Sequence, residues 1–137
     1  MKKFLLTLCF ITFGCVYAEE GVKPAVVQTA VVSQNIMFEN CSKIFGVNQE
    51  KLFYMTLASI SANKFSIDEI QTANGYIIFT ANRNKYLATI AKVDNSNSIL
   101  KITPCNNIYN FPPGIITNTI KYIELNVGEE TKNKESK

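Results

Sequence analysis

Few residues in this chain could carry out acid-base or nucleophilic chemistry, because the sequence contains no histidine. Histidine is the commonest general base near neutral pH and the usual partner of a nucleophilic Ser or Cys. Ser61 and Lys64 have the spacing of a Ser-x-x-Lys motif, but they fall at the expected end of a helix and no supporting motif accompanies them. Asp68 and Glu69 are adjacent, so on a strand they are expected to point to opposite faces and not to flank one bond. We therefore expect no catalytic residue and a protein that is not an enzyme.

Cysteine is the next reactive residue type. Of the four cysteines, Cys41 and Cys105 lie within the expected folded domain. An isolated pair in an oxidising compartment commonly forms a disulfide, which makes these two a disulfide candidate, and two buried thiols are the alternative. Two cysteines without histidine fall short of the four ligands of a structural zinc site, and no glycine-rich phosphate loop or calcium loop occurs. We expect neither a metal nor a cofactor.

The first eighteen residues have the pattern of an export signal. Lys2 and Lys3 precede an apolar run, residues 4–16, and the segment ends in Val16-Tyr17-Ala18, a pattern that signal peptidase cleaves. The run is too short to span a bilayer as a mature helix. We expect a signal peptide at 1–18, no transmembrane helix in the mature chain, and a periplasmic or secreted bacterial protein.

Cys15 offers a second interpretation of this N-terminus. A cysteine that follows Gly14 at the end of an apolar run could be lipidated, which would tether the protein to a membrane by acyl chains. Thr12 and Phe13 depart from the lipoprotein pattern, so cleavage after Ala18 is favoured.

The charge distribution bears on the kind of partner. The formal net charge is +3, and Lys2 and Lys3 of the signal account for most of it. Nucleic-acid binders carry a clustered basic face that displaces counterions from phosphate, and the scattered lysines of the mature chain do not form one. We expect no nucleic-acid partner.

Hydrophobic periodicity predicts two helices. The first covers 48–63, with Asn48 as N-cap and an apolar face, and the second covers 115–125 after a proline-rich break. The second is rich in β-branched residues, so a strand is the alternative there. The apolar faces consist of Phe53, Leu57 and Ile60 in the first helix and of Ile116, Ile120 and Ile123 in the second, and the solvated side of the first consists of Gln49, Lys51, Ser59 and Asn63.

Between the helices the apolar pattern has a period of two, which predicts strands. The expected strands are 65–71, 76–81, 85–93 and 98–103, separated by turns rich in Asn, Asp and Gly, with a short strand at 36–38 before them. We expect one α+β domain over 36–127, with two helices packed on one face of a three- to four-stranded antiparallel sheet. An N-terminal arm, 19–35, precedes it, and a disordered charged tail, 128–137, follows it.

Aromatic and basic residues near the turns are the candidates for a partner-binding surface. The aromatic rings could line a groove if the sheet keeps one face open, although tyrosines on small sheets usually cover the core. Lys92 and Lys101 would lie around this groove. The candidates are Tyr76, Tyr86, Tyr109, Phe111, Arg83 and Lys85.

The order of helix, strands and closing helix, with Gly75-Tyr76-Ile77-Ile78-Phe79 opening the second strand after the helix, resembles small helix-grip domains of exported bacterial envelope proteins. The domains of the accessory lipoprotein C of the outer-membrane barrel assembly machinery are similar. The resemblance covers 36–127 and implies a fold, with no functional residue carried over.

Export and the missing catalytic groups together predict a non-catalytic envelope protein that binds or scaffolds a partner. A secreted factor that acts on host or competitor molecules is one alternative. A small histidine-free enzyme is another.

Overall fold

The computed structural model describes the backbone of residues 33–135 and the side chains as far as Gly128. These residues belong to one compact unit. The predicted signal peptide, 1–18, and nearly all of the predicted arm, 19–35, lie outside the described residues. Within the described part, no helix is both long and apolar enough to cross a membrane.

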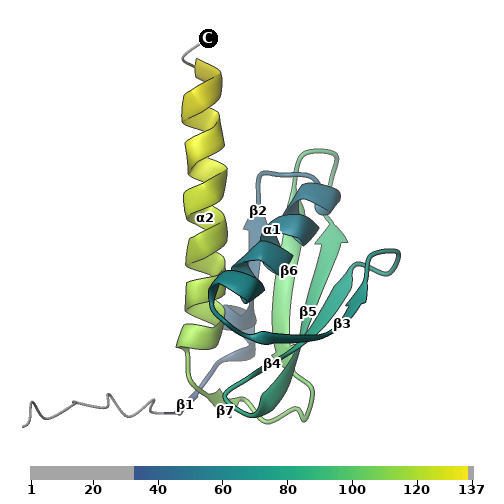
Figure 1. Cartoon of the computed structure of the whole chain (residues 1–137). Coiled ribbons are helices and arrows are strands. Elements are labelled where there is room, and N and C mark those ends of the chain that lie inside the picture. Colours follow the sequence, from purple (N-terminus) through teal and green to yellow (C-terminus); the bar gives the residue numbers. More distant parts are fainter. Residues whose placement is uncertain (1–32, 136–137) are drawn as a thin grey trace, which may run out of the picture. The chain divides into compact units, whose positions relative to one another are not determined.

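An antiparallel sheet of five strands, in the order β2-β6-β5-β4-β3, forms the centre of the fold (Figure 1). Four consecutive strands form a meander, and each begins and ends within two residues of a predicted strand. The α+β class is therefore confirmed. The four strands are β3 (Ser66–Gln71), β4 (Tyr76–Ala81), β5 (Asn84–Lys92) and β6 (Ser98–Pro104).

Three short strands escaped the sequence pattern, and one of them, β2, makes the main sheet larger than predicted. β2 (Ser42–Phe45) pairs with the outer side of β6, and β1 (Gln34–Asn35) pairs with β7 (Asn110–Phe111) in a separate two-stranded sheet. The predicted strand at 36–38 was wrong, since the chain there leads into a 3-10 turn, η1 (Phe38–Cys41). Strands of two to four residues are too short to show a period of two.

The turn between β4 and β5 is a two-residue hairpin connection. Asn82 and Arg83 have φ values of 47° and 67°, and Ala81 pairs with Asn84 across the turn. Positive φ at both central residues defines a type I′ turn, in which glycine is favoured at the second position. Arg83 therefore adopts a strained backbone conformation.

Gly75 sets the approach of the neighbouring turn to the sheet. Its φ is +67°, and a Cβ atom at this position would lie 2.5 Å from Ile90 O. The Ile90 N–H donates to Gly75 O at 2.7 Å, and Gln49 Nε2 donates to Ile90 O at 3.0 Å. These two hydrogen bonds hold the β3–β4 turn, β5 and the start of the first helix together, and only glycine leaves room for so close an approach.

The first helix, α1 (Gln49–Ala62), confirms the prediction over 48–63. Asn48 caps its N-terminus, with Oδ1 accepting a hydrogen bond from Lys51 N at 2.8 Å. Phe53 and Ile60 are buried and Leu57 is half-buried, so the apolar face lies where the spacing placed it.

The second helix, α2 (Gly114–Glu135), is longer than predicted. It runs past the expected end at residue 125 and through most of the tail expected to be disordered, 128–137. Glu and Lys are good helix formers, and extending a helix already fixed by packing costs much less than starting a new one.

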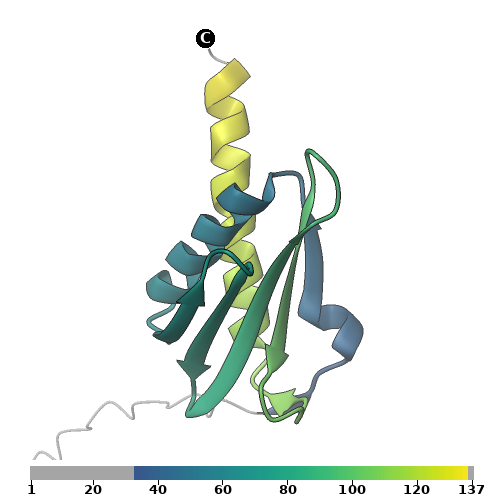
Figure 2. The same ribbon diagram turned by 90° about the vertical axis from the view of Figure 1, so that its right-hand side faces the viewer.

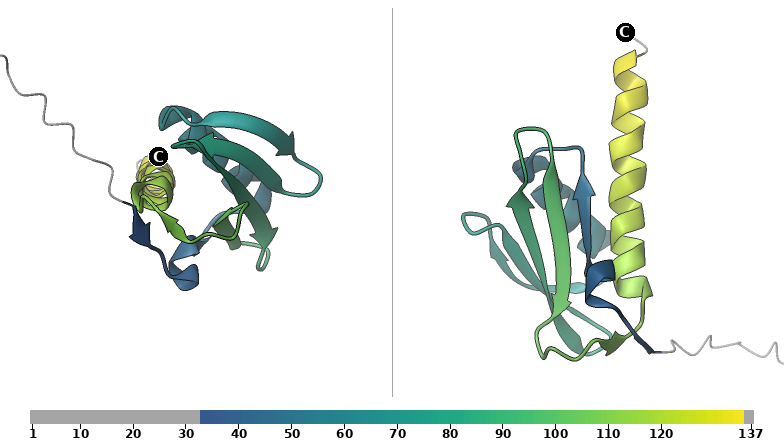
Figure 3. Two further views of the ribbon diagram at one scale, coloured as in Figure 1. Left: turned by 90° about the horizontal axis from the view of Figure 1, so that it is seen from below. Right: turned by 180° about the vertical axis from the view of Figure 1, so that it is seen from behind.

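Both helices lie on the same side of the five-stranded sheet, as predicted (Figures 2 and 3). Ser59, which was predicted to be solvated, is fully buried because α2 packs against that side of α1. Its hydroxyl donates to Thr119 O at 3.1 Å, so a small polar residue at the helix contact finds a partner.

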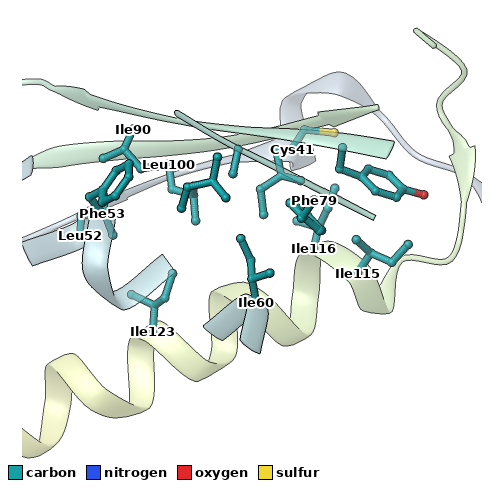
Figure 4. Packing of buried hydrophobic residues seen from close by; sticks show 14 of the residues in the cluster. Cys41, Leu52, Phe53, Ile60, Phe79, Ile90, Leu100, Ile115, Ile116 and Ile123 are labelled. Atoms are coloured by element: carbon teal, nitrogen blue, oxygen red, sulfur yellow. The ribbon is translucent and has the colours of Figure 1, made fainter. Parts of the chain in front are cut away.

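The hydrophobic core fills the space between the helices and the covered face of the sheet (Figure 4). Alternate residues of β4, β5 and β6 are buried, and the residues between them lie on the opposite, open face. The residues labelled in Figure 4 include Leu52, Phe53 and Ile60 of α1, Ile115, Ile116 and Ile123 of α2, and Phe79, Ile90 and Leu100 of the sheet.

The strained hairpin predicts that Arg83→Gly stabilises the protein. Glycine adopts positive φ without steric cost, so the free energy of unfolding should rise by about 1 kcal/mol, measured by urea denaturation. Arg83→Ala is the matched control, because it removes the guanidinium and keeps the Cβ atom. An equal gain from alanine would contradict the backbone explanation.

Candidate binding surface

An exposed apolar patch lies at the end of the sheet where η1 meets the connection between β6 and β7. The Phe38 and Tyr109 rings contact edge to face, with centroids 5.8 Å apart. Ile36 N donates to Tyr109 O at 2.7 Å, which fixes one segment against the other. Met37, Phe38 and Ile108 are 63%, 54% and 60% exposed. We call Met37, Phe38, Ile108 and Tyr109 the loop-end patch.

Three basic residues, Lys64, Arg83 and Lys85, lie at the same end of the sheet, and the side chain of Lys101 reaches this end from the middle of β6. We call these four the loop-end cations. Lys101 Nζ sits 4.0 Å from the centroid of the Phe38 ring, in a cation–π contact. Arg83 is in the β4–β5 turn, and Lys85 follows it by two residues. Tyr86 pairs with Pro104, the last residue of β6, so this turn lies beside the start of the β6–β7 connection.

Lys64 reaches the same end through the register of β3. Ser66, the first residue of β3, pairs with Thr80 near the end of β4, and Lys64 precedes it by two residues. Lys64, Asn82, Arg83 and Asn107 are the non-glycine residues with positive φ in residues 33–135, and all four lie at this end. Backbone strain of this kind tends to gather at functional sites.

Three predicted candidates come together here, namely Tyr109, Arg83 and Lys85. Arg83 and Lys85 are exposed and Tyr109 is half-buried. Tyr76 does not join them, because it begins β4 at the opposite end. The Tyr76 hydroxyl donates to Glu69 Oε1 at 2.8 Å, and this hydrogen bond to a carboxylate raises the pKa of Tyr76.

The other two aromatic candidates, Tyr86 and Phe111, are core residues, so the prediction that they line a binding surface was wrong. Both are buried. The Tyr86 ring lies between Phe79 and Phe111, with centroid distances of 5.5 and 5.2 Å. Burying such large rings contributes more to folding than an exposed position would allow.

Asp68 and Glu69 were predicted to point to opposite faces of the sheet, but both accept hydrogen bonds from residues on its open face. The β3–β4 register shifts between Ile67 and Glu69, which marks a β-bulge at Asp68. Thr80 Oγ1 donates to Asp68 Oδ2 at 2.7 Å, whereas Glu69 is bonded to Tyr76. Thr80 and Tyr76 are about 13 Å apart along the strand, so the two carboxylates still do not converge.

The predicted disulfide between Cys41 and Cys105 is not formed. Both are free thiols, Cys41 buried and Cys105 exposed. Ser42, which follows Cys41, pairs with Lys101, and Cys105 lies about 13 Å further along that strand. A disulfide requires Cα atoms within about 7 Å. Burial also raises the pKa of Cys41, with Lys101 acting weakly in the opposite direction, so this thiol is kept protonated.

The sequence interpretation did not name Met37, Phe38 or Ile108 as candidates, although it favoured the loop 106–114, which contains Ile108, as a site for a partner. Met37 and Phe38 were assigned to a short strand leading to Cys41, and the 3-10 turn exposes them instead. Ile108 was the better signal, since it is an aliphatic residue in a loop of asparagines, where nothing in the local pattern would bury it.

The side chains at this end can make apolar contacts and charge interactions. Among residues 33–128, whose side chains are described, no group of three or more Cys, Asp or Glu residues is placed to hold a metal ion. In comparisons with known proteins, the chain matches no protein-family model and no curated protein sequence.

Tyr86 generates a stability prediction. Its hydroxyl is buried and makes no hydrogen bond of standard geometry to a described residue, although the Asn84 side chain lies near it, so Tyr86→Phe should raise the free energy of unfolding by about 1 kcal/mol. Burial also raises the pKa of Tyr86 above its ordinary value of 10.0, with the Asn84 side chain acting in the opposite direction. The favoured neutral form contributes stability below pH 10.0, and this contribution is lost as the pH rises toward the folded-state pKa.

Urea denaturation at neutral and alkaline pH measures both effects. Tyr86→Phe should lose less stability than the wild type above pH 10.0, and Tyr109→Phe, a half-buried control, should behave like the wild type. A net loss of stability in Tyr86→Phe at neutral pH would show that the hydroxyl has a partner.

The cysteine geometry predicts two free thiols in the chain from Glu19. Cys105 should react at once with a thiol reagent such as dithionitrobenzoate, and Cys41 only after denaturation, because it is buried. The intact mass should not change on reduction. Absence of reactive thiol in unfolded, unreduced protein would instead establish the bond.

Proposed function

We propose that this chain is an exported, non-catalytic binding protein that holds a component of the bacterial envelope on its loop-end patch. The observation that carries the proposal is the exposure of Met37, Phe38 and Ile108 beside Tyr109. Exposed apolar groups gathered in one place favour an interaction site, and Met, Phe, Tyr and Arg are enriched in interfaces.

The position of the patch supports the same function. Its residues come from η1 and the β6–β7 connection, which are held by the Ile36–Tyr109 hydrogen bond at the end of a packed sheet. Binding residues are commonly carried on connections that a rigid scaffold positions. The scaffold here is the five-stranded sheet with its two covering helices.

A non-catalytic role is supported by the chemistry of the chain. The sequence has no histidine, and the adjacent carboxylates Asp68 and Glu69 accept hydrogen bonds from separate residues of β4. The export part rests on the signal pattern at 1–18, and the resemblance to helix-grip envelope domains agrees with it.

Photocrosslinking in the producing cells tests this proposal. A photoreactive phenylalanine analogue in place of Phe38 should form adducts with an envelope component. The same analogue in place of Tyr54, a residue of α1 that is also 54% exposed, should form several-fold fewer.

Equal yields at the two positions, or none at Phe38, would contradict the loop-end patch as the binding site. Adducts formed only after the protein reaches the culture medium would favour the secreted factor over the envelope protein.

A further inference from the structure

We propose that the component bound by the loop-end patch is the surface of an anionic phospholipid bilayer. This inference rests on the proposed function and names the chemistry of its partner. It is carried by exposed apolar side chains and unbalanced cations at one end of the sheet.

The charges at this end are unbalanced in favour of cations. The four loop-end cations are opposed by three acidic residues, Glu39 in η1 and Asp68 and Glu69 in β3, which leaves an excess of one positive charge. Asp68 accepts a hydrogen bond from Thr80, and its Oδ2 lies 3.9 Å from Lys85 Nζ. A net positive end complements a layer of phosphate headgroups, which attracts basic residues close to the surface.

The apolar residues are arranged as a bilayer interface would require. Met37, Phe38 and Ile108 project from short connections, so they can enter between headgroups while the sheet stays outside. Lys101 lies over the Phe38 ring, which places an ammonium group directly beside the apolar surface. Long basic side chains can extend their charge to phosphate while their stems lie on apolar groups, and aromatic rings favour the headgroup level.

The chain connectivity points the same way. The described chain begins at Ser33, and β1, which follows directly, pairs with β7 at this end of the sheet. The residues before Ser33 are therefore joined to the domain at the end that carries the patch, and an acyl chain on Cys15, the alternative to cleavage after Ala18, would tether the domain to a membrane through that end.

Vesicle co-sedimentation of the chain from Glu19 to Lys137 tests the proposal. In the described part of the chain, the buried core residues lie between Cys41 and Ile123, and circular dichroism verifies that the chain from Glu19 folds. The protein should sediment with vesicles of phosphatidylcholine and phosphatidylglycerol in a two-to-one mixture. Binding should be about tenfold weaker to phosphatidylcholine alone and should fall at high salt.

Matched variants locate the binding surface. Arg83→Gln with Lys85→Gln, and separately Phe38→Ser with Ile108→Ser, should each weaken binding to the mixed vesicles by about tenfold. The controls are Lys51→Gln with Lys92→Gln, at the start of α1 and the end of β5 on the opposite side of the domain, and Tyr54→Ser. These controls should bind like the wild type.

The outcomes separate the two proposals. Equal losses in the control variants would overturn the lipid site, because attraction would then come from net charge alone. Lack of vesicle binding together with a protein adduct at Phe38 would overturn the lipid inference and leave the proposed function standing. Lack of both would overturn both.

Discussion

The fold depends on covering one apolar face of an antiparallel sheet, and α1 provides the first part of that cover. A sheet with an apolar face is not stable in water until another layer buries that face. Leu52, Phe53 and Ile60 bring one side of α1 onto the sheet. The remaining area is closed by α2, which is why a serine and a threonine can meet at the contact between the helices.

Because both helices cover the same face of the sheet, the ends of the strands and the second face are not covered by them. The chain enters the sheet, reverses between strands and leaves for α2 through connections that expose most of their side chains, apart from buried residues such as Cys41 and Phe111. Non-glycine residues with positive φ, as far as the chain is described, are found at one of these ends. The core determines the fold, and the connections at that end determine which side chains meet the surroundings.

The elements with a long, regular pattern could be predicted from the sequence. α1 and the four meander strands have enough residues to show a period, and Asn48 and Gly75 supply local signals for a cap and a turn. What could not be predicted depends on tertiary contacts. Ser59 is buried only because α2 covers it, and β2 exists only because β6 offers it an edge.

The candidate surface was predicted in part for the same reason. Arg83 and Lys85 lie at turn positions that a sequence can reveal. The burial of Tyr86 could be predicted only by knowing which face of its strand is covered, and that of Phe111 only by knowing the short β1–β7 pairing. The bulge at Asp68 brings the Asp68 and Glu69 side chains to the same face of the sheet, and no residue type in that strand predicts the bulge.

The same bulge affects how copies of this protein behave toward one another. β3 is an outer strand of the sheet, and such a strand offers unpaired backbone groups to any other chain that can align with it. A bulge with two carboxylates makes that edge irregular and charged. On the other outer strand, β2, Lys43 forms an ion pair with Glu124 of α2. Both outer strands are therefore protected against edge-to-edge aggregation of the sheet, while the loop-end patch stays exposed.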